Sequence, residues 1–230
     1  MRAGLFGKLP AKRDFVALAA PRAFLTVWER WLQGGVSASR QELGPAWQDA
    51  FLRAPIWRFW LGAEISGAPV VGAFMPSVDG VGRYFPLSVF AAAEEGDVLP
   101  PPELAPQEDW FAAAEEVLLG ALDTEARYED VVAALGGLPF PSVALAPPEG
   151  TSRLPRGPMM STAGGAAGFA AARIADHARF YGAATYWWTI GGEGFAPALL
   201  AEHRMPDPYL FTAMLTGRFA PASAAPVAAG

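Results

Sequence analysis

The chain of 230 residues carries 17 basic and 23 acidic side chains, for a net charge of −6, and 52% of its residues are hydrophobic. This length and composition suit a globular protein that buries a sizeable core. Because no stripe of lysine or arginine could neutralise a phosphate backbone, nucleic acid is not expected as a partner. Cysteine is absent, which excludes disulfides, thiolate metal ligands and a cysteine nucleophile.

Neither of the segments that could direct the chain to a membrane has the required length. The amino terminus reaches Lys8 before an apolar core of signal-peptide length could form. The longest run of small residues, 163–175, is interrupted by glycines and by Arg173, and it is too short and too weakly apolar to cross a bilayer. We therefore expect a cytoplasmic protein without membrane insertion.

Two helices are predicted before residue 55. Apolar side chains follow a helical stripe over residues 21–32, with proline at the first position and Gly34 and Gly35 as a stop signal. A second helix is predicted to begin at Ser39, whose hydroxyl can cap it while Glu42 completes a capping box.

Strands are predicted next. Residues 56–65 are rich in aromatic and β-branched residues, and the apolar runs 70–75 and 84–89 flank a turn. Gly80 and Gly82 in that turn can adopt the positive φ that tight connections require. This pattern predicts a hairpin.

The second half of the chain alternates connections and helices. A proline-rich connection at 98–106 precedes two helical stripes, 110–122 and 128–135. Residues 147–158 are again rich in proline and glycine and predict a surface loop that could act as a lid or a partner-facing arm. A last helix is predicted to begin at Asp207.

A strand is predicted at residues 186–190. Trp187 and Trp188 within it should point to opposite faces of a sheet, so both are buried only if helices cover both faces. Trp28, Trp47 and Trp57, and Trp110 of the later helical stripe, are also expected to be buried, because each lies on an apolar stripe or strand.

The element pattern predicts a single α/β domain over residues 1–218, with helices on both faces of a mixed, partly antiparallel sheet. Residues 219–230 are mostly alanine and proline with little to bury, and we expect them to form a disordered tail.

Asp79 and Arg83 place a charged pair at the predicted hairpin tip. They could form a local salt bridge and an Asx-type turn that holds the loop, or they could make the tip a recognition loop. By contrast, His177 and His203 are the only histidines, and neither belongs to a catalytic or metal-binding motif. No metal, cofactor or catalytic residue is expected.

Three blocks of sequence carry a family resemblance. They are Gly7-Lys8-Leu9-Pro10 with Asp14-Phe15, then Ala54-Pro55-Ile56-Trp57-Arg58-Phe59, and finally Met75-Pro76-Ser77-Val78-Asp79 with Gly82-Arg83-Tyr84-Phe85-Pro86-Leu87. In this order and spacing the chain resembles the TagF family, also called ImpM, of proteins associated with bacterial type VI secretion. Arg13 stands where the family pattern has a glycine before the Asp-Phe pair.

The resemblance implies a three-layer α/β/α sandwich as the fold. It also implies a regulatory function. The family is linked to post-translational repression of type VI secretion, through the forkhead-associated scaffold protein of that system. We therefore expect a non-enzymatic accessory protein, and the alternative is a small-ligand module or hydrolase that uses Asp79 as acid or base and Arg83 to hold an anion. The polar residues of the three blocks are the candidate partner-binding residues: Lys8, Asp14, Arg58, Ser77, Asp79 and Arg83.

Overall fold

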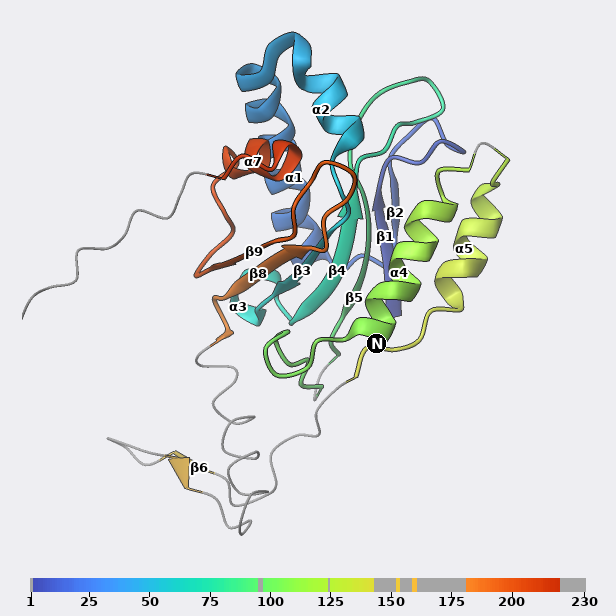
Figure 1. The fold of residues 1–230 in the computed structure, drawn as a ribbon. Coiled ribbons are helices and arrows are strands. Elements are labelled where there is room, and N and C mark those ends of the chain that lie inside the picture. Colours follow the sequence, from blue (N-terminus) through green and yellow to red (C-terminus); the bar gives the residue numbers. More distant parts are fainter. Residues whose placement is uncertain are drawn as a thin grey trace, which may run out of the picture.

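The computed structural model describes residues 2–94, 97–123, 125–142, 152–153, 159–160 and 181–219 (Figure 1). The predicted loop at 147–158 lies outside the described residues, apart from the short strand β6 (Ser152–Arg153), which pairs with β7 (Met159–Met160). His177 and residues 220–230 also lie outside them. Phe219, the first residue of the predicted tail, packs against Trp57.

A seven-stranded sheet forms the centre of the described fold. Its strands, in spatial order, are β2 (Val16–Leu18), β1 (Arg2–Gly7), β5 (Leu87–Ala92), β4 (Val70–Met75), β3 (Trp57–Leu61), β8 (Thr185–Thr189) and β9 (Ala198–Glu202). The predicted α/β class is confirmed, and so is the predicted hairpin, as β4 and β5. The prediction of a mixed sheet is wrong, because every neighbouring pair is antiparallel. The strands that follow helices, β3 and β8, also lie beside oppositely directed neighbours.

Helices lie against both faces of this sheet (Figure 1). The helices on one face are α1 (Arg22–Leu43), α2 (Trp47–Arg53) and α7 (Leu210–Thr216), and those on the other are α4 (Glu108–Gly120) and α5 (Tyr128–Gly136). Two short elements complete the described helices, the 3-10 turn η1 (Gly44–Ala46) and α3 (Ala63–Ser66).

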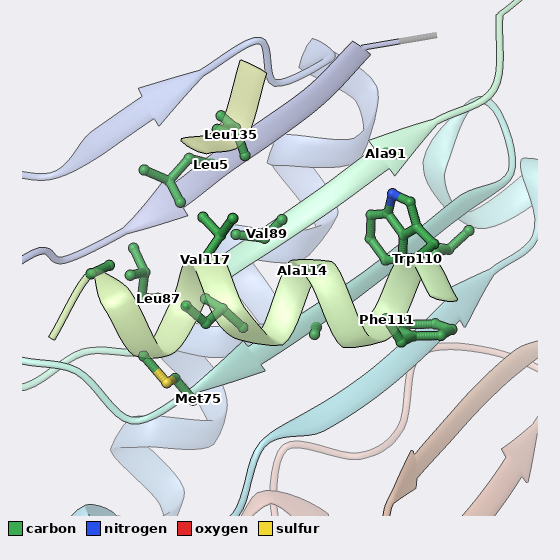
Figure 2. Packing of buried hydrophobic residues seen from close by; sticks show 14 of the residues in the cluster. Leu5, Met75, Leu87, Val89, Ala91, Trp110, Phe111, Ala114, Val117 and Leu135 are labelled. Carbon is green, nitrogen blue, oxygen red and sulfur yellow. The ribbon is translucent and has the colours of Figure 1, made fainter. Parts of the chain in front are cut away.

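Each face of the sheet has its own core. The core under α1 and α7 is dominated by aromatic rings, whereas the core under α4 is mainly aliphatic. Successive strand residues alternate between the two, as Val70 and Val71 of β4 illustrate. In Figure 2, α4 lies across the strands with Phe111, Ala114 and Val117 among the side chains at this second core.

Helix α1 continues through the predicted stop at Gly34 and Gly35. A Cβ on Gly35 would lie 2.7 Å from the Phe211 ring of α7, so this glycine permits close helix packing rather than ending the helix. The predicted helix start at Ser39 is therefore wrong as well. Ser39 is buried inside α1, where its hydroxyl accepts a hydrogen bond from Trp47 Nε1 at 2.9 Å.

The predicted burial of the tryptophans is confirmed for Trp28, Trp47, Trp57 and Trp110. Trp187 is fully buried and its ring stacks on Trp28 at 5.8 Å between centroids. Trp188, its neighbour in β8, is half-buried on the opposite face, where its ring meets Phe111 of α4 edge-on. The predicted strand at 56–65 is shorter than expected, since β3 ends at Leu61 and is followed by the helical turn α3.

Candidate functional site

Two loops that are distant in sequence meet at one end of the sheet. Strands β1 and β5 pair antiparallel with Gly7 opposite Leu87, so the loop after β1 (residues 8–15) lies beside the loop before β5 (residues 76–86). The Gly80 amide donates to the Lys12 carbonyl at 2.8 Å, which joins the two loops through their backbones. A Cβ on Gly80 would lie 2.9 Å from the Pro10 carbonyl oxygen, so the close approach requires glycine.

Asp79 is the centre of this junction. Its carboxylate is 0% exposed and lies 2.9 Å from Lys8 Nζ, whose side chain is only 8% exposed. The Arg83 guanidinium donates through Nε to the same oxygen at 2.7 Å. The backbone amides of Val81 and Arg83 donate to the other oxygen at 3.1 and 2.9 Å. The carboxylate therefore has four donors and no contact with solvent.

The hydrogen bonds also explain the acidity of this carboxyl group. Burial by itself raises the pKa of Asp79, but hydrogen bonds from the Arg83 backbone, Lys8, the Arg83 side chain and the Val81 backbone outweigh burial. The net result is a pKa well below the usual range for aspartate. Asp79 is thus ionised at neutral pH, and the four donors that surround its carboxylate all belong to the protein.

The predicted pairing of Asp79 with Arg83 and with the loop backbone is confirmed, but Asp79 is not exposed at the tip. The exposed partner is Arg83, whose side chain is 56% exposed. Its terminal nitrogen donates to the Arg13 carbonyl and lies 4.0 Å from the exposed carboxylate of Asp14. Lys8, Asp14, Asp79 and Arg83 therefore belong to one cluster, which we call the loop junction.

Arg58 belongs to a different cluster. It lies on β3, and its guanidinium binds Glu115 at 2.5 Å and Glu108 at 2.7 Å, both on α4, above the ring of Phe111. Burial by itself lowers the pKa of Arg58, but the hydrogen bonds and charges of Glu115 and Glu108 outweigh it and raise the pKa. This cluster, which we call the Arg58 cluster, fastens α4 to the sheet.

Ser77 lies in the second loop, before Asp79. It is buried, and its hydroxyl has no hydrogen-bond partner among the described residues. Its carbonyl accepts from the Phe85 amide at 3.0 Å, so the contribution of Ser77 to the loop that we can identify is made by its backbone.

Two apolar side chains at the loop junction were not among the predicted site residues. Val81 is 55% exposed between Asp79 and Arg83. Phe15 is also exposed, although one edge of its ring contacts Phe85 at 4.9 Å between centroids. The available sequence signal was an apolar residue inside a polar turn, which is unusual where nothing is buried.

A hollow beside the first loop does not include the charged pair. A cavity of about 300 Å³ is lined by Lys12, Asp14, Phe15 and Tyr128 together with their neighbours in the first loop, and neither Asp79 nor Arg83 lines it. His203 is exposed after β9. In the part of the chain that the structure describes, no group of three or more His, Asp or Glu side chains is arranged to hold a metal ion. Within the same residues, no helix has both the length and the apolarity needed to cross a membrane.

Comparison with known proteins gives a consistent assignment. Residues 4–138 match the family described as the TagF N-terminal domain, type VI secretion system-associated. The fold is similar to the crystal structure of PA0076 from Pseudomonas aeruginosa PAO1, with a TM-score of 0.81 and 32% sequence identity over 97% of this chain and 98% of that one. No curated protein matches the sequence. The matched region contains the loop junction and the Arg58 cluster, and the chain belongs to the TagF family of type VI secretion-associated proteins.

Proposed function

We propose that this protein is a non-enzymatic, cytoplasmic accessory protein that represses the type VI secretion system after translation by binding one of its components. The forkhead-associated scaffold protein of that system is the candidate partner. The observation that carries the proposal is the contrast within the loop junction: Asp79 is fully enclosed by donors, while Arg83 beside it is largely exposed. A rigid loop that displays its outer side chains suits docking.

The same contrast argues against the enzymatic alternative. A general acid or base must reach the substrate and is most effective with a pKa near the working pH. Asp79 is enclosed, its pKa is far below neutrality, and four donors already occupy it. A reaction at Asp79 would first require the junction to open.

The proposed contact surface consists of Asp14, Phe15, Val81 and Arg83, which we call the loop platform. Arg83 already donates through Nε to Asp79 and through one terminal nitrogen to the Arg13 carbonyl, so its remaining N–H groups would bind a partner carboxylate, and apolar neighbours exclude water from such contacts. The loop platform therefore suits a partner surface that offers an acidic residue beside an apolar one.

The direct test measures binding of the purified forkhead-associated scaffold protein by calorimetry. Val81→Asp introduces a charge on the loop platform, and we expect it to weaken binding by at least tenfold. Leu199→Asp is the matched control, because Leu199 is also an exposed aliphatic residue but lies on β9, outside the loop platform. Equal affinities for both variants and the parent protein would refute the assignment of this surface.

A test in cells addresses repression itself. Overproduction should reduce effector secretion in proportion to dose without changing the levels of the secretion components, because a stoichiometric binder acts by occupation. A double variant, His177→Ala with His203→Ala, should repress as well as the parent. If the folded double variant fails to repress, a histidine-dependent activity becomes the better explanation.

A further inference from the structure

Phe15 is the larger of the two apolar side chains on the loop platform. Its side chain is 47% exposed, yet two rings of the aromatic core contact it. The Phe85 ring meets it edge-on at 4.9 Å between centroids, and the Phe6 ring lies nearly parallel to it at 6.1 Å. Phe15 therefore presents part of its ring to solvent while the rest is packed, as an aromatic anchor of an interface does.

A third contact of this ring comes from the side chain of Lys8. Lys8 Nζ lies 5.2 Å from the centre of the Phe15 ring, a distance at which a cation is attracted to the electrons of the ring face. The same nitrogen lies 2.9 Å from Asp79 Oδ2. One ammonium group therefore joins the enclosed carboxylate of the second loop to the exposed ring of the first.

The enclosure of Lys8 strengthens its contact with the ring. The Lys8 side chain is only 8% exposed, and the attraction between a cation and a ring is stronger when water is excluded from the cation. In the part of the chain that the structure describes, Lys8 is the only cation placed over Phe15. The comparable contact of Lys12, in the same loop, is with Tyr128 at 4.2 Å.

The need to neutralise Asp79 does not by itself account for a buried lysine. The Asp79 carboxylate also receives hydrogen bonds from the Arg83 side chain and from the backbone amides of Val81 and Arg83. Without Lys8, Asp79 would thus keep one cation and two amide donors. Phe15 would lose the cation over its ring, and no other described residue replaces it.

We propose that Lys8 is a positioning residue of the loop platform: its ammonium, held by Asp79, fixes the Phe15 ring in the orientation in which the ring contacts the partner protein. Because Lys8 is enclosed, it acts through Phe15 and does not itself touch the partner. The effect of Lys8 on binding rests on the proposed function, whereas its effect on the ring needs no partner.

The first experiment follows the Phe15 ring by NMR in the full chain with ¹³C-labelled phenylalanine. The ring signals of Phe15 are assigned by their loss in Phe15→Leu. Lys8→Met keeps an unbranched side chain without the ammonium, and we expect it to move these signals towards those of a solvent-exposed phenylalanine. Lys8→Arg keeps a cation and should leave them near their positions in the parent protein. Lys12→Met is the matched control, because it removes the cation from Tyr128 instead and should not move them.

A measurement on the parent protein requires no variant to fold. Nuclear Overhauser effects should connect the Hε protons of Lys8 with the ring protons of Phe15, because Lys8 Nζ lies 5.2 Å from the centre of that ring. If the parent protein shows no such effects, the ammonium does not hold the ring, and the positioning role is wrong.

The second experiment measures binding of the purified forkhead-associated scaffold protein by calorimetry. We expect Lys8→Met to weaken binding about fivefold, which corresponds to the loss of one contact between a cation and a ring. Lys8→Arg should bind like the parent protein. Because Lys8 acts through Phe15, Lys8→Met should cause no further loss in a Phe15→Leu background. A purely structural role for Lys8 would weaken binding equally in both backgrounds.

Two further results would overturn the positioning role of Lys8. One is a folded Lys8→Met variant in which the Phe15 ring signals are unchanged, since the ring would then keep its orientation without the ammonium. The other is an equal loss of binding for Lys8→Met in the presence and absence of Phe15. If the parent protein does not bind the scaffold protein at all, the proposed function fails instead, and the ring signals still decide the role of Lys8.

Discussion

The loop junction and the Arg58 cluster are opposite solutions to burying charge. In the loop junction a carboxylate is central, and two cations and two backbone amides surround it. In the Arg58 cluster a guanidinium is central, 6% exposed, and the carboxylates around it are more accessible to solvent. The first joins two loops and shapes what they display, whereas the second fastens a helix to a strand.

This difference predicts that mutations in the two clusters lower the free energy of unfolding by unequal amounts. Removing one member of a buried ion pair is damaging mainly when the remaining charge cannot be rehydrated. Without Asp79, Lys8 keeps a charge that is almost entirely enclosed. Without Arg58, Glu108 is already exposed and Glu115 is partly so. The loop junction should therefore be the more sensitive of the two.

The largest effect is expected for Asp79→Asn, which leaves the Lys8 ammonium buried without a counter-charge. The free energy of unfolding, measured in urea, should fall by about 3–5 kcal/mol. Asp49→Asn is the matched control, because Asp49 pairs with Arg53 on the surface of α2 and should contribute only about 0–1 kcal/mol. A loss as small as that of the control would show that the junction does not stabilise the fold.

A smaller loss is expected for Arg58→Met, which keeps the apolar stem but removes the guanidinium. Its hydrogen bonds to charged partners suggest a cost of about 1–3 kcal/mol in the same urea measurement. Arg127→Met provides the comparison, because Arg127 forms an exposed pair with Asp130, so its replacement should change stability less than Arg58→Met does. If Arg58→Met cost more than Asp79→Asn, the proposed order of the two clusters would be reversed.

The loop junction should also be sensitive to acid. Because the pKa of Asp79 is lower in the folded than in the unfolded protein, its stabilisation is fully present above the unfolded pKa, about 4. It is lost as the pH falls below that value towards the folded pKa. Urea unfolding at pH 7, 5, 4 and 3 should show a shallower decline for Asp79→Asn than for the parent. Parallel declines would contradict the lowered pKa.

The smallest effect on stability is expected for Arg83→Ala. Asp79 would keep Lys8 and two backbone amides, and the exposed Arg83 side chain should contribute only about 0–1 kcal/mol. Binding of the scaffold protein should weaken much more than folding does. Several kcal/mol lost on unfolding, with normal binding, would instead make Arg83 a purely structural residue.

Much of the candidate site was predictable from local sequence. Asp79 and Arg83 lie in one turn, and Gly82 of that turn has the predicted positive φ, whereas Gly80 does not and is required by its close approach to the Pro10 carbonyl. Lys8 and Arg58 were also predicted as site residues from the sequence. The sequence did not predict that they belong to different clusters. That separation depends on strand pairing, since β1 beside β5 brings Lys8 to Asp79 while β3 faces Arg58 towards α4.

The sequence by itself determined the family, the α/β class, the β4–β5 hairpin and the burial of Trp28, Trp47, Trp57 and Trp110, because these follow from local motifs and apolar periodicity. Only the tertiary structure decided the direction of the strands, the passage of α1 through Gly35 and the enclosure of Asp79. Each of these features depends on which segment, distant in sequence, packs against the residues concerned. Contacts between distant segments leave no periodic signal in either segment alone, so they become visible only in the folded protein.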